Sequence, residues 1–255
     1  MIHETAVIDA SAKIGKNVSI GPYSVIGPQV EIGEGTWIGP HVVIQGPTRL
    51  GKHNKIYQFA SVGEAPQDLK FKGEETWLEM GDHNTVREFV TINRGTAQDH
   101  AVTKIGDHNL FMAYVHIAHD CVIGNHTVFS NNASLAGHVT IEDYVVFGGF
   151  SGVSQFCRVG AHSFVATNAV VIKDVPPYVL VSGHYAKPYG LNTVGLQRRG
   201  FSEPIVNDIK RAYKVLYRQG LKVSEAVAVL RETAQPPEVN AFLQFIEQSK
   251  GGIVR

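Results

Sequence analysis

The sequence predicts a mainly β protein, a parallel β solenoid that ends in a small α-helical domain. An aliphatic residue recurs at every sixth position, glycine often follows it, and helical spacing takes over beyond residue 171. A helix of period 3.6 cannot keep one residue type at every sixth place on one face. Strand alternation does not explain the glycines. A chain that turns a corner every hexad explains both, with three faces making one coil of about 18 residues.

The aliphatic frame runs through residues 2–62, returns in 80–92 and continues through 105–171. A small or β-branched residue stands two places before each aliphatic, so we expect both to pack inside the coil. Cys121 and Cys157 occupy this small position two coils apart. That separation is roughly 9–10 Å, beyond the roughly 7 Å reach of a disulfide. Both cysteines are therefore predicted to fill the core.

Two polar segments interrupt the frame, near residues 64–79 and 94–101. After the first, which contains Pro66 and Gly73, the frame resumes 18 residues on, so this segment should project without shifting the phase. The second slips the frame by one residue. Long loops in a regular solenoid are often functional, and surface excursions without a role are the alternative.

Helical spacing predicts three helices near the end of the chain. Ser202 is the expected N-cap of the first, which should stop at Gly220. Ser224 is the expected cap of a second helix through about Thr233, and residues 237–248 suggest a third. Such a tail would cover the open end of the stack.

We place the domain boundary between residues 1–190 and 191–255. The second part holds ten Lys and Arg against six Asp and Glu, a net of +4 (10 − 6) inside a chain of zero formal net charge. A basic surface suits an acidic partner, and an ordinary solvated face is the alternative.

Composition excludes several classes of protein. The neutral chain is not expected to bind nucleic acid. It has no run of 18 apolar residues, so no stable membrane insertion is expected. The N-terminus lacks a basic segment followed by an apolar one, and two cysteines make no disulfide framework. A cytoplasmic location is the simplest expectation.

Residues about 18 apart stack in such a coil. One corner of two adjacent coils then gathers three histidines, an aspartate and a glycine: His116, His119, Asp120, Gly137 and His138. This set offers a general base near neutral pH, a backbone N–H for an oxyanion, and a carboxylate to hold an imidazole tautomer. A second column, His108, His126 and His162, has no acidic neighbour in register, so we interpret it as surface or subunit contact, with metal ligation a lesser alternative.

Several segments make a resemblance specific. They read Q-D-L-K, N-L-F-M-A-Y-V-H-I-A-H-D-C, N-N-A-S-L-A-G-H-V, S-Q-F-C-R-V-G-A-H, K-D-V-P-P-Y-V and G-L-Q-R-R-G-F. Over essentially its whole length the chain resembles the hexapeptide-repeat acyltransferases, and among them the acyl-[acyl-carrier-protein]–UDP-N-acetylglucosamine O-acyltransferase family of lipid A biosynthesis in Gram-negative bacteria. The resemblance implies a left-handed parallel β-helix, against the usual right-handed crossover.

The resemblance implies transfer of an (R)-3-hydroxyacyl group from acyl carrier protein to the 3-hydroxyl of UDP-N-acetylglucosamine. The transfer would be direct, with no acyl-enzyme, cofactor or metal. His119 would be the general base, Asp120 its support, and the Gly137 N–H the oxyanion donor. His116 and His138 would contact the sugar and the pantetheine arm.

The resemblance also implies further substrate-binding residues: Gln67, Asp68, Lys70, Gln155, Asn192, Arg198 and Arg199. The three on the first loop would reach in from a neighbouring subunit of a homotrimer. The last three would lie near the nucleotide phosphates and the carrier protein. The two arginines suit such anionic groups, because a planar guanidinium can bond two oxygens at once.

One column in the repeat consists of Ala113, Asn131, Gly149 and Thr167. We expect it beside the histidine corner, where the resemblance implies a groove that measures the acyl chain. Glycine at the position of Thr167 would leave room for a longer chain, so Thr167 is expected to select a shorter one, with Gly149 as a further substrate-binding residue of this column.

The sequence departs from the family pattern at three positions. Asn93 and Ser154 stand where histidine is common, and Val194 stands where an acidic residue is common. Substrate contacts are expected to differ there.

Three alternatives compete. The related N-acyltransferase of the same pathway carries an extra N-terminal domain, whereas the hexads here begin at Ile2. A solenoid zinc hydrase of the carbonic anhydrase type would use His116, His119 and His138 as ligands, but gives the helical tail no purpose. A structural solenoid without activity leaves the aligned cluster unexplained.

Overall fold

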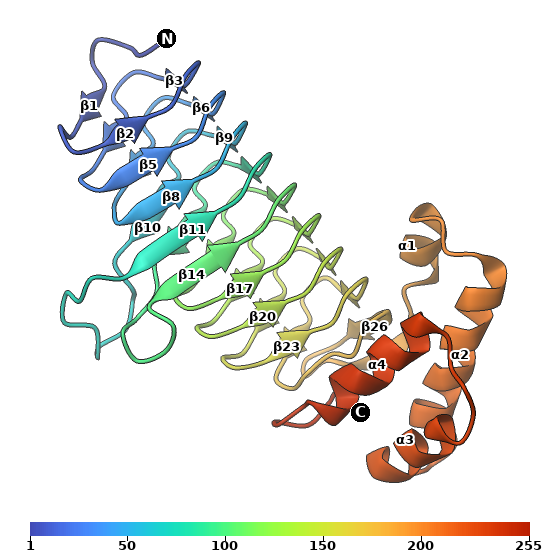
Figure 1. Cartoon of the computed structure of the whole chain (residues 1–255). Helices are drawn as coiled ribbons and strands as arrows, with labels where there is room; N and C mark the ends of the chain where they lie inside the picture. The colour runs from blue at the N-terminus through green and yellow to red at the C-terminus, as the bar shows by residue number, and fades with distance from the viewer.

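The computed structural model describes all residues, 1–255, and has the form of a triangular prism of short strands with helices at one end (Figure 1). Three parallel sheets form its faces, and every third strand along the chain joins the same sheet. Partner residues lie one coil apart, as His116 and Ser134 do. The predicted left-handed parallel β-helix with a small helical C-terminal part is confirmed.

The first sheet has nine strands and carries the face beside the histidines. Its strands are β1 (Val7–Ile8), β4 (Val25–Ile26), β7 (Val43–Ile44), β10 (Ser61–Glu64), β13 (Thr91–Asn93), β16 (His116–Ile117), β19 (Ser134–Leu135), β22 (Gly152–Val153) and β25 (Val170–Val171).

The second sheet follows the first around each coil and has eight strands. They are β2 (Lys13–Ile14), β5 (Val30–Ile32), β8 (Thr48–Leu50), β11 (Trp77–Met80), β14 (Val102–Ile105), β17 (Val122–Ile123), β20 (Thr140–Ile141) and β23 (Arg158–Val159).

The third sheet closes the triangle with ten strands, the last two antiparallel to each other. They are β3 (Ser19–Ile20), β6 (Trp37–Ile38), β9 (Lys55–Ile56), β12 (Thr85–Val86), β15 (Leu110–Phe111), β18 (Val128–Phe129), β21 (Val146–Phe147), β24 (Phe164–Val165), β26 (Val179–Ser182) and β27 (Lys187–Leu191).

The interior holds the aliphatic frame and the small residues that precede it, as predicted. Phe111, Phe129 and Phe147 stack inside the prism at centroid distances of 5.2 and 4.5 Å. Cys121 and Cys157 are both free and buried, which confirms their role as core residues. Ile2 follows the frame but is 47% exposed, because no coil lies beneath the first one.

Most corners of the coil are turned by residues other than glycine. Asp120 and His138 have φ angles of 58° and 62°, in the left-handed region. The conformation is unfavourable for a residue with a Cβ, but backbone bonds between coils hold it, such as the one from His138 N to the His119 carbonyl at 3.0 Å. Side chains at these corners point outward and stack from coil to coil.

The second histidine column is such a stack. Its rings lie 4.8 to 5.9 Å apart in the order His53, His83, His108, His126, Tyr144, His162 and Tyr178. Burial and the nearby Arg199 guanidinium lower the pKa of His162 to about 4.

Both interruptions leave the prism at the corner between the first and second sheets, between β10 and β11 and between β13 and β14. Figure 1 shows the two loops projecting on the same side. The first loop spans residues 65–76 and the second 94–101. The predicted first interruption was too long, because Trp77–Met80 forms β11 and pairs with both β8 and β14.

The chain ends in α1 (Thr193–Arg198), α2 (Glu203–Arg218), α3 (Val223–Arg231) and α4 (Pro237–Glu247). Sequence reasoning missed α1. Ser202 is the N-cap of α2, as predicted, although its side chain makes no capping bond. The predicted cap at Ser224 is wrong: Lys222 is the N-cap of α3, because the Glu225 carboxylate accepts from the Lys222 N–H at 2.8 Å.

These helices pack against the last coils in one apolar cluster with the prism core. The Arg158 guanidinium lies 4.3 Å from the ring of Phe245 in α4, and Asp174 pairs with Ile253 near the C-terminus. The tail thus covers one end of the stack. None of the helices combines the length and apolar character needed to span a bilayer.

Candidate active site

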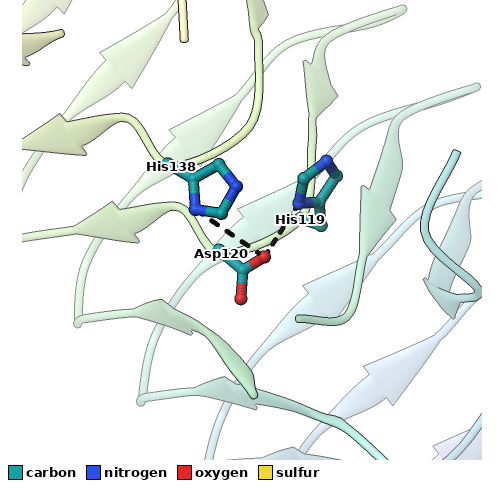
Figure 2. Close-up of side chains that lie close together, drawn as sticks. All are labelled: His119, Asp120 and His138. Carbon is teal, nitrogen blue, oxygen red and sulfur yellow. Dashed lines mark hydrogen bonds and ion pairs between the residues drawn. The ribbon is translucent and has the colours of Figure 1, made fainter. Parts of the chain in front are cut away.

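His119 and Asp120 follow β16, and His138 follows β19 on the next coil, all at the corner between the first and second sheets. Figure 2 shows both imidazoles turned toward the carboxylate of Asp120. Nδ1 of His119 lies 2.8 Å from Oδ2 of Asp120. A carboxylate only accepts hydrogen bonds, so Nδ1 carries the proton and Nε2 is left as an acceptor.

The side chain of Asp120 is completely buried, and every contact suits an ionised carboxylate. The Thr96 N–H donates to it at 2.9 Å and the Thr96 hydroxyl at 2.6 Å. The Asp120 N–H in turn donates to the Thr103 hydroxyl at 2.8 Å. Burying a charge is costly unless it is paired and hydrogen-bonded. These partners therefore keep Asp120 charged and immobile beside His119.

Gly137 lies directly against the ring of His119, as the register predicts. A Cβ at position 137 would sit 2.6 Å from Cε1 and 2.8 Å from Nε2 of His119. The Gly137 N–H donates to no group of the chain, whereas its carbonyl accepts from the Phe156 N–H at 3.3 Å. A backbone donor without a partner thus lies beside the basic nitrogen.

His138 stacks on Phe156 at 4.6 Å and meets the His119 ring edge-on at 5.0 Å. Its Nδ1 lies 2.7 Å from Oδ2 of Asp99, which the sequence did not identify. Phe156 was missed too, although it follows His138 by one coil and the repeat could have found it. Asp99 lies on the second loop, and no periodicity predicts where that loop runs.

A pocket of about 660 Å³ opens over this corner. Its lining is mostly polar and comes from both loops and three coils: Gln67, Asp68, Lys70, Gln98, Asp99, His119, His138, Gln155 and Phe156. The first-loop residues were predicted to reach a neighbouring subunit, but they line the pocket of their own chain. They do so because both loops leave from the corner that carries His119, on the coils just before it.

His116 lies apart from this cluster, on the face of the first sheet. Its Nδ1 is 2.7 Å from the Thr91 hydroxyl, and burial, aided by nearby His119, lowers its pKa. It lines a shallow groove of about 380 Å³ with Ser134, Gly152 and Ser154 among others. The polar atoms that converge within 4.8 Å belong to His119, Asp120 and His138. Within one chain, the three histidines of the zinc alternative therefore do not form one cluster.

The column of Ala113, Asn131, Gly149 and Thr167 does form, since the Phe150 N–H donates to the Asn131 carbonyl and the Asn168 N–H to the Gly149 carbonyl, both at 3.0 Å. It was expected beside the histidine corner, and this was wrong. The column precedes the strands of the first sheet and the histidines follow them, so the width of that sheet separates the two. The groove with His116 lies between them.

Asn192 and Arg198 line a separate pocket of about 320 Å³ on the third sheet, together with Val194. Asn192 caps α1, accepting from the Gly195 N–H at 3.1 Å, and donates to the His162 carbonyl at 2.9 Å. Arg199 lies 4.1 Å from the Tyr144 ring, and burial lowers its pKa. Within one chain these residues do not share the pocket of His119.

Asn93, one of the three departures, has a structural role. Its side-chain amide donates to the Ala65 carbonyl at 3.0 Å, and Arg94 donates to the Gly63 carbonyl at 3.0 Å. These bonds tie the base of the first loop to the next coil. The loop that carries Gln67, Asp68 and Lys70 is therefore anchored to the corner by Asn93.

Comparison with known proteins gives matches along the chain. A family profile described as bacterial transferase hexapeptide (six repeats) matches residues 1–33, 29–64 and 103–137. Residues 174–254 match the second domain of the Udp N-acetylglucosamine O-acyltransferase family. An acyl-[acyl-carrier-protein]–UDP-N-acetylglucosamine O-acyltransferase from Thiobacillus denitrificans is 59% identical, over 100% of this chain and 99% of the relative.

Two solved structures are also similar. LpxA from Acinetobacter baumannii is 49% identical with a TM-score of 0.97, over 100% of this chain and 99% of that one. The UDP-N-acetylglucosamine O-acyltransferase of Moraxella catarrhalis is 46% identical with a TM-score of 0.97, over the same shares.

Proposed function

The chain belongs to the family of acyl-[acyl-carrier-protein]–UDP-N-acetylglucosamine O-acyltransferases, and we propose that it catalyses the reaction of this family. It transfers an (R)-3-hydroxyacyl group from acyl carrier protein to the 3-hydroxyl of UDP-N-acetylglucosamine. This is the first step of lipid A biosynthesis. The observation that carries the mechanism is the 2.8 Å contact between His119 Nδ1 and Asp120 Oδ2, which leaves Nε2 basic. The cytoplasmic location expected from the sequence stays a prediction.

His119 acts as the general base. Its Nε2 takes the proton of the sugar hydroxyl while the hydroxyl oxygen attacks the thioester carbon. The imidazolium that forms is stabilised by Asp120, whose charge is fixed by its bonds to Thr96. His138, the other imidazole of the pocket, lies 3.9 Å from Asp120, and its hydrogen-bond partner at 2.7 Å is Asp99, whose side chain is 31% exposed.

The carbonyl oxygen becomes an oxyanion when the new C–O bond forms, and it accepts a hydrogen bond from the Gly137 N–H. The C–S bond then breaks and the carbonyl is restored. The leaving pantetheine thiolate takes the proton back from His119, so the products are an ester and a free thiol. Proton transfer and oxyanion stabilisation suffice, because a thioester is already activated.

A covalent acyl-cysteine is not part of this mechanism. Burial raises the pKa of the Cys121 thiol to about 12 and that of Cys157 to about 11. Thiols that stay protonated are poor nucleophiles. Both side chains belong to the core and lie outside the pocket lining.

The active unit is a homotrimer with sites between its subunits. Supporting this, His119 and the first loop lie at one corner of the prism, whereas Asn192, Arg198 and Arg199 belong to α1 and its two caps, and the first two line a pocket against the third sheet. A three-fold axis can bring the third sheet of one subunit to the histidine corner of the next. The arginines then reach anionic groups of the nucleotide or carrier protein.

Residues 1–190 and 191–255 act as two domains, and the start of α1 at Thr193 supports this division. The second carries ten basic against six acidic residues and suits an acidic carrier protein. The acyl chain occupies the groove beside His116 on the first sheet and extends toward the column of Gly149 and Thr167. Thr167 limits its length.

The test is an assay of purified protein with 3-hydroxyacyl carrier protein and UDP-N-acetylglucosamine, in which mass spectrometry detects the acylated sugar nucleotide. We expect His119→Ala to lower kcat roughly 10²- to 10⁴-fold. His41→Ala, at an exposed corner on the other side of the first sheet, is the matched control and should retain activity. A wild-type protein that forms no such product contradicts the proposed function.

A further inference from the structure

Asp99 lines the pocket with a carboxylate that the mechanism above leaves without a role. Nδ1 of His138 lies 2.7 Å from Oδ2 of Asp99 but 3.9 Å from Oδ2 of Asp120. Asp99 is therefore the hydrogen-bond partner of His138. Because a carboxylate accepts, the proton of neutral His138 lies on Nδ1 and its Nε2 is left as an acceptor.

The ring of His138 is held in place by packing, independently of Asp99. It stacks on Phe156 with an interplanar angle of 14° and meets His119 at 88°. Its side chain is only 16% exposed. Packing fixes the position of the ring, but it does not determine which ring nitrogen carries the proton. The bond to Asp99 decides that.

The second loop connects the two histidines through their carboxylates. Thr96 on this loop donates to Asp120, the partner of His119, and Asp99 three residues later accepts from His138. On its outer side Asp99 lies 3.3 Å from Nε2 of His100, whose side chain is 74% exposed. One short loop thus holds both histidine–carboxylate pairs in a fixed relation.

We propose that Asp99 is a positioning residue for acyl transfer. It holds His138 in the Nδ1–H tautomer, so that Nε2 accepts a hydrogen bond from an N–H or O–H group of the bound substrate, such as an amide of the pantetheine arm or a hydroxyl of the sugar. Asp99 itself touches no reacting atom. The kinetic consequence rests on the proposed function, whereas the tautomer does not.

The kinetic test is a double-mutant cycle of Asp99→Ala and His138→Ala. Loss of a charge-assisted hydrogen bond should lower kcat/KM of Asp99→Ala roughly 10- to 100-fold. If Asp99 acts only through His138, adding Asp99→Ala to His138→Ala should change kcat/KM less than about twofold. Asp99→Asn, whose amide oxygen can still accept, should keep more activity than Asp99→Ala. A full further loss in the double variant, or an unimpaired Asp99→Ala, overturns the proposal.

The tautomer is measured without substrate, by long-range proton–nitrogen NMR of protein labelled with ¹⁵N-histidine. His138 of the wild type should show a protonated Nδ1, and Asp99→Ala should move the proton to Nε2. His100→Ala removes only the exposed outer contact and is the control, expected to leave His138 unchanged. An Nδ1–H tautomer that survives in folded Asp99→Ala overturns the proposal even if acyl transfer is confirmed. Should Asp99→Ala fail to fold, the isosteric Asp99→Leu takes its place.

Discussion

Gly137 presents bare backbone to the imidazole of His119. A Cβ at position 137 would stand 2.6 Å from Cε1 of that ring, closer than real side chains approach. The ring cannot simply turn away, because its Nδ1 is bound to buried Asp120 and it packs against the His138 ring in a T-shaped contact. The glycine thus allows both the position of the base and access to a backbone donor.

Gly137→Ala should therefore displace the His119 ring and lower kcat. A shift of about 1 Å in a catalytic group can cost about 100-fold, so we expect a loss of one to two orders of magnitude. Gly251→Ala is the matched control, because a Cβ there meets nothing within 4 Å. Steady-state kinetics and thermal unfolding measure the two effects. An alanine at position 137 with normal kcat contradicts the close packing.

Asn93→Ala should loosen the first loop. The side-chain amide of Asn93 is buried and donates to the Ala65 carbonyl at 3.0 Å, which the variant leaves without this donor. We expect a loss of about 1–3 kcal/mol in stability and a higher KM, since Gln67 and Asp68 lie on this loop. Limited proteolysis should cut the variant faster within 65–76. If proteolysis is faster but KM is unchanged, Asn93 anchors the first loop, and the loop's contribution to substrate binding is contradicted.

Two inactive variants should complement each other if sites lie between subunits. His119→Ala removes the base, and Arg199→Ala removes the guanidinium at the end of α1, away from the pocket of His119. When equal amounts of the two variants assemble at random into trimers, about one quarter of interfaces pair an intact His119 with an intact Arg199. Co-refolded protein should regain about that fraction of activity. Recovery no greater than the sum of the separate variants indicates that each chain acts alone.

Thr167→Gly should shift the preference toward longer acyl groups. The substitution removes a side chain from the column that precedes the strands of the first sheet, toward which the proposed acyl chain extends. Competition between 3-hydroxyacyl carrier proteins of different chain length measures the ratio of kcat/KM. One methylene in an apolar site is worth about 1–3 kcal/mol, so the ratio should move by about tenfold or more. If this ratio of kcat/KM values stays constant, residues other than Thr167 determine the preferred acyl-chain length.

Stability should fall in mild acid, partly through His162. Burial and Arg199 lower its pKa from 6.5 to about 4. The unfolded chain therefore binds a proton between these values that the folded chain does not, so the free energy of unfolding rises with pH across this window and levels off above it. His162→Phe keeps the ring stack and removes the titration. Its Nδ1 has no hydrogen-bond partner to lose.

The measurement is urea unfolding of wild type and His162→Phe at pH about 7.5 and about 5. When the pH falls from the higher to the lower value, the free energy of unfolding should decrease less for His162→Phe than for the wild type. His100→Phe, at an exposed position, is the control and should follow the wild type. If the free energy of unfolding of His162→Phe decreases with pH as much as that of the wild type, groups other than His162 govern the acid sensitivity.

The repeat by itself determined which residues stack. Backbone ladders join coils residue by residue, so His119 beneath Gly137 and the burial of Cys121 follow from counting along the chain. The same counting places Phe156 on His138. The helices α2 and α4 follow from apolar spacing, which packing against the last coils confirms.

Only the tertiary structure decided where the two loops run. They leave the ladder, so no register relates them to the coils, and side-chain bonds over arbitrary separations hold them: Asp99 reaches His138 across 39 residues, and Thr96 reaches Asp120 across 24. The pocket therefore combines a repeat that can be read in the sequence with loops that cannot. Periodic backbone bonding transmits position along the chain, whereas a loop takes the place where its few polar contacts are best satisfied.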